Sequence, residues 1–306
     1  MREHVLVLPL GEGPTLPLLA AGAAGHATAA IWPGIGASAR SIVGFRLDPG
    51  SSTLEFRHPG EAVYFVRAGS GEVIGTSADD PTDAPARTVE LSAGAVVHVA
   101  AGTPYRFRAA PAAPAFDVIG GPCPPDPAWF SGVVATAERA AAYRATAADP
   151  APATSGVGQG GGVRVLSIDE PALMLPIISS DARMIAWPGN GAWDATMNYV
   201  RMEPGEENTE HAHAHSEDTI VILEGRGSVD DLSAGRTLEF KAGDVIHVPA
   251  RVRHAVRANR GSPVVSAGGP CPADLVFLRR CGAEIPDRRP ATETSPATPA
   301  TRGRLR

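Results

Sequence analysis

A repeat within the 306 residues constrains the fold of this chain more than any other feature of its sequence. Motifs of the first half recur in the second half in the same order, and the separation between matching residues drifts only slowly along the chain. The matches are Trp32-Pro33-Gly34 with Trp187-Pro188-Gly189, Pro49-Gly50 with Pro204-Gly205, Glu61 to Gly69 with Glu217 to Gly225, His98 with His247, and Gly120 to Pro124 with Gly268 to Pro272. Such a series predicts two copies of one domain.

Each copy contains short apolar runs that alternate with Gly and Pro, the pattern of an all-β domain. In the first half the predicted strands are Ser41–Leu47, Ala62–Val66, Glu72–Gly75, Arg87–Leu91, Val96–Val99, Tyr105–Arg108 and Phe116–Ile119. In the second half they are Ala195–Met202, Thr219–Leu223, Gly227–Val229, Arg236–Phe240, Val245–Val248, His254–Arg257 and Val264–Ser266. Evenly spaced short strands favour a sandwich or a small barrel.

A run of histidines in the second half points to a metal site. His211, His213 and His215 alternate with small residues, Glu217 follows, and His254 comes later. Alternate side chains of a strand share one face, so the side chains at positions 211, 213, 215 and 217 are expected on the same face of a strand. Imidazole nitrogens and a carboxylate that converge from a rigid sheet suit a divalent transition metal.

These residues resemble the two sequence motifs of the cupin superfamily. The residues that fit the first motif are Gly205, His211, His213, Glu217 and Gly225, and those that fit the second are Gly243, Pro249 and His254. Arg251 stands where the second motif has a glycine, and the spacing from Glu217 to Gly225 is one residue longer than the motif. The resemblance implies two tandem double-stranded β-helix barrels, the jelly-roll fold of a bicupin.

The resemblance also implies a single ion bound by His211, His213, Glu217 and His254. Iron is the leading expectation, and manganese, nickel and zinc remain open because the same donors bind all of them. Asp218 is an alternative to Glu217, because it fits the motif spacing on both sides, but in a regular strand it would point out of the barrel.

The first half serves as an internal control for this site. At the positions expected to match His211, His213 and His254 it carries Glu55, Arg57 and Tyr105, and only Glu61 keeps its counterpart. An arginine offers no lone pair to a metal. The first half is therefore expected to be a structural barrel, with binding of an anion as the alternative.

Residues that are identical at matching positions of both halves are expected to have a structural role, since a metal is expected in only one half. They include His98 with His247, and Cys123 with Cys271 in matching Gly-Gly-Pro-Cys-Pro turns.

The expected domains are 1–135 for the first cupin, 136–162 for a linker, 163–284 for the second cupin and 285–306 for a disordered tail. Segments 1–30 and 163–185 resemble each other and are expected to be arms that cover a sheet of the other half or of a second subunit.

Composition narrows the classes of partner. A net charge of −6 without a basic block argues against nucleic acid. No apolar run reaches the roughly 18 residues of a membrane helix. Three cysteines do not form a disulfide framework, so a cytoplasmic protein is expected, as a monomer or homodimer that acts on a small molecule.

The resemblance implies several functions without choosing among them. The leading hypothesis is a metal-dependent oxidoreductase, an Fe(II) dioxygenase, in which His215 moves a proton. Non-oxidative chemistry with manganese, nickel or zinc, as in an isomerase, lyase or cyclase, is the second. A non-catalytic binding or regulatory protein is the third.

Overall fold

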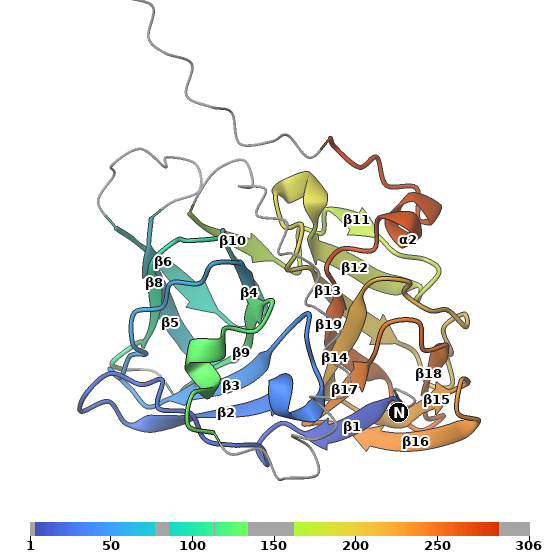
Figure 1. Ribbon diagram of the computed structural model, residues 1–306, viewed down its shortest axis with the longest axis horizontal. Helices are drawn as coiled ribbons and strands as arrows, with labels where there is room; N and C mark the ends of the chain where they lie inside the picture. The colour runs from blue at the N-terminus through green and yellow to red at the C-terminus, as the bar shows by residue number, and fades with distance from the viewer. Residues whose placement is uncertain (1–3, 77–85, 113, 134–161, 288–306) are drawn as a thin grey trace, which may run out of the picture.

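The computed structural model describes residues 4–76, 86–112, 114–133 and 162–287. Two β-barrels lie side by side and are built from the two halves of the chain (Figure 1), which confirms the predicted all-β, tandem jelly-roll fold. Nearly all of the predicted linker and tail falls outside the described residues. No helix in the described ranges has the length and apolarity needed to span a membrane.

The first barrel is formed by a large and a small antiparallel sheet. Its elements are β2 (Gly25–Ile31), η1 (Pro33–Ile35), β3 (Ile42–Leu47), β4 (Glu61–Ala68), β5 (Ser70–Gly75), β6 (Arg87–Ser92), β7 (Ala95–Val99), β8 (Tyr105–Ala109), β9 (Phe116–Cys123) and η2 (Pro127–Phe130). The large sheet has the order β10-β7-β4-β9-β3-β2, in which β10 (Val163–Ser167) comes from the second half of the chain, and the small sheet has the order β6-β5-β8.

The second barrel repeats this plan. Its elements are β11 (Leu173–Met174), β12 (Asp181–Ala186), η3 (Pro188–Asn190), β13 (Met197–Met202), β14 (Glu217–Glu224), β15 (Arg226–Asp231), β16 (Arg236–Lys241), β17 (Asp244–Val248), β18 (His254–Ala258), β19 (Val264–Cys271) and α2 (Leu275–Arg280). The large sheet has the order β1-β17-β14-β19-β13-β12-β11, in which β1 (Leu6–Pro9) comes from the first half of the chain, and the small sheet has the order β16-β15-β18. Every predicted strand coincides with an observed one, whereas the strands of the two predicted arms and their ends, namely β1, β2, β10, β11 and β12, had not been predicted as strands.

The two halves exchange one strand each. β1 (Leu6–Pro9) pairs antiparallel with β17 of the second barrel, and β10 (Val163–Ser167) pairs antiparallel with β7 of the first. In Figure 1 the blue β1 accordingly lies among the orange strands. The predicted arms therefore extend a sheet of the other half within the same chain, and both large sheets gain an outer strand.

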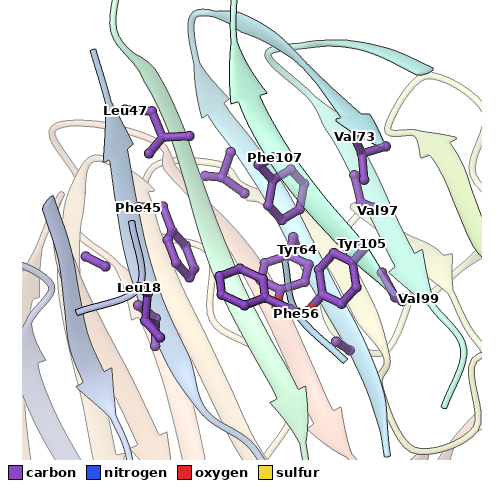
Figure 2. Close-up of a cluster of buried hydrophobic side chains, with 14 of the residues drawn as sticks. Leu18, Phe45, Leu47, Phe56, Tyr64, Val73, Val97, Val99, Tyr105 and Phe107 are labelled. Carbon is purple, nitrogen blue, oxygen red and sulfur yellow. The ribbon is translucent and has the colours of Figure 1, made fainter. Parts of the chain in front are cut away.

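Three apolar cores follow from the alternation of side chains along these strands. One fills the first barrel and is rich in aromatic rings such as Phe45, Tyr64 and Phe107 (Figure 2). A second fills the other barrel with mainly aliphatic side chains, and a third lies between the barrels. The inter-barrel core holds the two halves as one body, because strands β4 and β14 each contribute one face to it.

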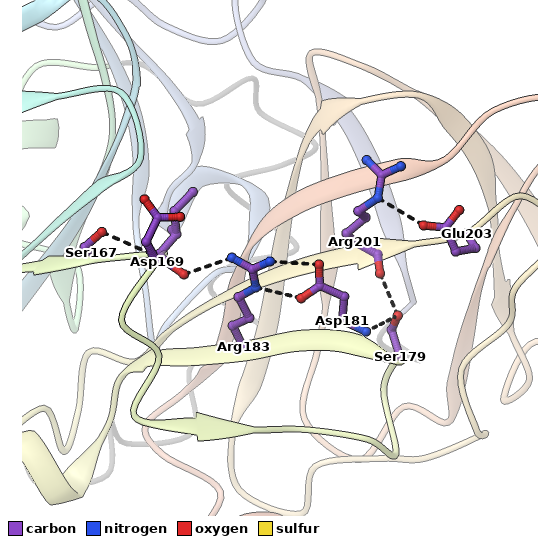
Figure 3. Close-up of polar contacts among 8 residues, drawn as sticks. Ser167, Asp169, Ser179, Asp181, Arg183, Arg201 and Glu203 are labelled. Carbon is purple, nitrogen blue, oxygen red and sulfur yellow. Dashed lines mark hydrogen bonds and ion pairs between the residues drawn. The ribbon is translucent and has the colours of Figure 1, made fainter.

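The segment that leads from β10 to β12 is fixed by polar contacts (Figure 3). Arg183 on β12 donates to Asp181 at 2.6 and 3.0 Å and to the carbonyl oxygen of Ile168 at 3.1 Å. The Ser179 hydroxyl donates to the carbonyl oxygen of Arg201 at 2.6 Å. These contacts hold the chain where it crosses from the first sheet to the second.

Candidate metal centre

Strand β14 determines which carboxylate faces the interior of the second barrel. Successive side chains of a strand point to opposite faces. Ile222 packs in the core of the second barrel, whereas Val221 packs between the barrels. Asp218 shares the face of Ile222 and therefore points inward, and Glu217 shares the face of Val221 and points toward the first half.

Four side chains able to ligate a metal converge inside the second barrel. His211, His213, Asp218 and His254 each offer one ligand atom, and these atoms all lie within 4.8 Å of one another. His211 and His254 are neighbours because their backbones form an antiparallel bridge, in which each backbone N–H donates to the other residue's carbonyl oxygen, with N to O distances of 3.1 and 2.9 Å. Three of the four are buried, and only His211 is partly exposed.

Hydrogen bonds orient all three imidazole rings in the same way. Nδ1 of His211 and of His254 lies 2.9 and 3.1 Å from the carbonyl oxygen two residues earlier in the chain. Nδ1 of His213 lies 2.8 Å from Oδ2 of Asp274. Because these oxygens accept, each Nδ1 donates, and the lone pair is left on Nε2. Such outer contacts are how proteins prepare histidines for a metal.

The polar atoms at the centre of the cluster are suited to a cation. Among the described residues, Asp218 Oδ1 and His254 Nε2 are buried without a hydrogen-bond partner. Asp218 Oδ2 lies 3.9 Å from Nε2 of His213 and 3.7 Å from Nε2 of His254, which is too far for a hydrogen bond. Unsatisfied buried groups are costly, and a divalent transition metal between three imidazoles and a carboxylate would satisfy them.

The protonation states also fit a metal site. Burial, and then the neighbouring histidines, lower the pKa of His211 to about 4. Burial alone would raise the pKa of Asp218, but its interactions with the three histidines, His254 first, outweigh burial and lower that pKa to about 2. At neutral pH His211 is therefore neutral and Asp218 ionised, the forms in which these side chains bind metals.

Glu217 does not join this cluster. Its carboxylate accepts hydrogen bonds from the Ser38 N–H at 2.9 Å, the Ser38 hydroxyl at 2.6 Å and the Ala39 N–H at 3.1 Å, all in the first half. Glu61 of the first half makes the equivalent contacts to the second half. Its carboxylate accepts hydrogen bonds from the backbone N–H groups of residues 194 and 195 at 2.9 and 3.1 Å. The matching glutamates thus tie each barrel to the other.

A bend explains why Asp218 replaces the predicted Glu217. The prediction assumed one regular strand from the histidines to the glutamate. Instead the chain bends at Ala214 and His215 before β14 begins at Glu217. The bend interrupts the alternation, so the next side chain to face the histidines is that of Asp218, and Asp218 rather than the expected Glu217 lies in the cluster.

His215 and two arginines lie near the outer side of the cluster. His215 is exposed at the bend, and the described part of the structure gives it no hydrogen bond or ion pair. Arg251 takes a left-handed backbone conformation, φ 68°, and its N–H donates to the carbonyl oxygen of His213 at 2.7 Å. This conformation explains why glycine suits that position. Arg253 pairs with Glu210 at 2.6 Å on the surface.

Helix α2 supplies two residues that sequence reasoning missed. Asp274 caps the helix by accepting from the Phe277 N–H at 2.9 Å, and its other oxygen holds His213. The Phe277 ring lies 5.9 Å from the His211 ring in a stacked arrangement and 5.8 Å from that of His213. Asp126 occupies the matching position after the first Pro-Cys-Pro turn, so the repeat contained a signal for Asp274.

In the first barrel, the positions that match the metal-binding cluster are occupied by residues other than those predicted. The Phe56–Tyr105 bridge matches the His211–His254 bridge. The positions that match His211 and His213 are therefore Phe56 and His58, not Glu55 and Arg57. Tyr105 matches His254 as predicted.

Aromatic packing fills this place (Figure 2). His58 keeps its partner, with Nδ1 2.7 Å from Asp126, but its Nε2 lies 2.9 Å from the Tyr105 hydroxyl, which is also hydrogen-bonded to that of Tyr64. Trp129 packs 4.9 Å from the His58 ring. Burial raises the pKa of both tyrosines well above the ordinary range. A ligand set with one imidazole and neutral phenols does not suit a transition metal.

Comparison with known proteins identifies both halves. The cupin domain family matches residues 44–116 and 198–266. Polyketide synthase CurC of Streptomyces cyaneus is 36% identical over 67 residues, 22% of this chain and 42% of that protein. L-ectoine synthase of Hyphomonas neptunium is 31% identical over 72 residues, 24% of this chain and 53% of that protein. The matched segments thus span about half the length of these relatives, or less.

Solved structures share the two-barrel arrangement. Oxalate decarboxylase from Bacillus subtilis, solved at pH 4.6, superimposes with a TM-score of 0.58 at 15% identity, covering 90% of this chain and 77% of that one. Oxalate decarboxylase from Lactobacillus farciminis, solved as a formate complex, gives 0.56 at 16% identity, covering 90% and 88%. At this level of identity the similarity establishes the fold alone.

Proposed function

Because the chain is a two-domain member of the cupin superfamily, we propose that it is a metal-dependent enzyme that acts on a small organic molecule. The observation that carries the proposal is the donor set of the second barrel. His211, His213 and His254 would bind one divalent ion through Nε2, and Asp218 through its carboxylate. Four protein ligands leave open positions on an octahedral ion, where a substrate could bind.

The reaction we favour is non-oxidative, a decarboxylation, cyclisation or related lyase step on a small carboxylic acid. A bound ion would supply Lewis-acid stabilisation of negative charge on a substrate oxygen. With Asp218 as its one anionic ligand, a divalent ion would still attract a negatively charged oxygen of the substrate at an open position. The names of the similar proteins, oxalate decarboxylase and ectoine synthase, support this class. None of them supports the dioxygenase that the sequence suggested first.

The residues around the ligands have distinct roles in this proposal. Asp274 and the two backbone carbonyls keep the imidazole rings in the orientation that presents Nε2. Phe277 covers the rings of His211 and His213 and keeps water from that side. His215, which is exposed at the bend two residues after His213, retains its proposed role in proton transfer. The first barrel supports the second, through the hydrogen bonds that Glu61 and Glu217 make across the interface.

The test is metal analysis and turnover with the full-length protein. We would purify it, measure bound metal, and reload the metal-free protein with manganese, iron, nickel or zinc. Each form would be incubated with a panel of small carboxylic acids that includes oxalate, with products followed by NMR and oxygen by electrode. Metal-dependent turnover without oxygen consumption is expected. Turnover coupled to oxygen uptake would select the dioxygenase, and metal binding without turnover would select a binding or regulatory protein.

A further inference from the structure

A fully buried arginine lies between the two barrels, outside the metal centre. Arg40, between β2 and β3, has 0% of its surface exposed. Its guanidinium contacts the carbonyl oxygens of Thr196 at 3.3 Å and Gly269 at 3.4 Å, Cys271 Sγ at 3.8 Å and Met197 Sδ at 3.9 Å. Arg40 Nε has no acceptor, and no carboxylate of the described residues bonds to this guanidinium.

This arrangement requires a counter-charge. An arginine remains protonated in proteins, and a buried charge without a partner of opposite sign is among the most costly features a fold can carry. The group in contact with Arg40 that can become an anion is the Cys271 thiol. A thiolate at this place would neutralise the guanidinium.

A second cysteine completes the arrangement. Cys123 Sγ lies 3.8 Å from Cys271 Sγ, and both side chains are buried in the inter-barrel core. They end the matching strands β9 and β19, where each pairs with the glutamate that ties the barrels together, Glu61 and Glu217. The two sulfur atoms therefore belong to opposite barrels and face each other across the interface.

We propose that Arg40 holds Cys271 as a thiolate and that Cys271 and Cys123 form a redox site, which a peroxide converts into a disulfide between the barrels. Closing the bond requires the sulfur atoms to approach from 3.8 Å to about 2.0 Å. The environment of the sulfurs favours this assignment of roles. Burial raises the pKa of Cys271, but the hydrogen bond from Cys123 and the charge of Arg40 outweigh it and lower that pKa to about 7. Burial raises the pKa of the Cys123 thiol, which therefore stays protonated.

The chemistry balances with hydrogen peroxide as the oxidant. The Cys271 thiolate attacks one peroxide oxygen, so an S–O bond forms, the O–O bond breaks and hydroxide leaves, taking up a proton to become water. The Cys123 sulfur then attacks the sulfenic sulfur of Cys271. The S–S bond forms, the S–O bond breaks and a second water leaves with the Cys123 proton. Two thiols lose two electrons, and one peroxide is reduced to two waters.

The experiment is peroxide titration of the full-length protein, with the metal-loaded form and the metal-free form in parallel. After treatment the protein is denatured in an alkylating reagent, digested and mapped by mass spectrometry. Cys281, which is partly exposed, serves as the internal control for oxidant exposure. We expect linked peptides that contain Cys123 and Cys271, with the loss of two hydrogen atoms, reversed by dithiothreitol. Alkylation of both cysteines in samples whose Cys281 is fully oxidised would overturn the proposal.

Variants separate the two roles. Cys123→Ser should stop the reaction at the sulfenic acid of Cys271, which dimedone traps. Arg40→Met should slow formation of the link on the order of tenfold near neutral pH, the loss of thiolate that a rise of one unit in the thiol pKa gives. If Arg40→Met does not fold, the Cys123→Ser protein still decides, because dimedone labelling of Cys281 alone would refute a reactive thiolate at Cys271.

Discussion

The pair of variants Asp218→Asn and Glu217→Gln tests the central assignment, because each removes one of two neighbouring carboxylates. Asp218 faces three histidines, whereas Glu217 faces Ser38 and Ala39 in the first half. The sequence motif alone would predict metal loss for Glu217→Gln. The structure predicts it for Asp218→Asn.

The expected magnitudes follow from the contacts. Removal of an outer partner of a metal ligand costs about 10- to 100-fold in metal affinity, so loss of the carboxylate ligand itself should cost more than about 100-fold. Glu217 accepts from two backbone N–H groups and one hydroxyl. A neutral amide keeps one acceptor oxygen and turns an NH₂ group toward the remaining donor. At about 1.5–3 kcal/mol for a hydrogen bond to a charged group, Glu217→Gln should lower the free energy of unfolding by about 2–4 kcal/mol.

The assay is calorimetric titration of metal into both metal-free variants, with denaturant unfolding of the same samples. Asp218→Asn should fold and bind metal weakly, and Glu217→Gln should be destabilised and bind metal within about threefold of the parent, well inside the cost of an outer partner. The reverse pattern, with metal binding lost in Glu217→Gln and kept in Asp218→Asn, would refute the placement of the carboxylates.

Four further outcomes are expected. Asp274→Asn should lower metal affinity about 10- to 100-fold by weakening the contact to His213, with the helix cap retained because Asn caps as well as Asp; unchanged affinity in titrations would contradict this. Removal of the ion by a chelator should lower the free energy of unfolding by about 2.7 kcal/mol relative to protein at a metal concentration of about 100 times Kd; equal melting with and without metal would argue against a specific ion. Tyr105→Phe should cost about 1–3 kcal/mol, because His58 loses a buried partner, and should leave the metal content at one ion per chain; a changed metal content in elemental analysis would contradict an aromatic-filled first barrel. His215→Gln should keep the metal and lower turnover by about 10²- to 10⁴-fold if this residue transfers a proton; unchanged turnover would remove it from the mechanism.

The fold could be predicted well from the sequence because each half of the repeat gives independent evidence for the strands of the other half. Each strand of one half had to reappear in the other, and the Gly and Pro turns between them fixed its limits. β1, β2, β10, β11 and β12 were not predicted as strands, since they lie in or at the end of the two segments that were predicted to be arms. The short apolar runs in those segments do not reveal which sheet a strand will join.

The errors at the site trace to a single extra residue. Two residues separate His58 from Glu61, whereas three separate His213 from Glu217. The extra residue forms the bend that turns Asp218 inward, and it also shifted the comparison of the two halves by one position. A signal for the correct answer was present. The first half keeps the glutamate as Glu61, but it has Phe56, Tyr105 and Ala62 at the positions that match His211, His254 and Asp218. The carboxylate that is absent together with two of the histidines is therefore the one that we expect among the metal ligands.

The exchange of β1 and β10 bears on any attempt to divide this protein. A fragment that ends before the second half would leave β7 as an open edge, and a fragment that starts there would leave β17 in the same state. Open edges recruit other strands. Separate halves should therefore be poorly soluble alone and should recombine when they are produced together.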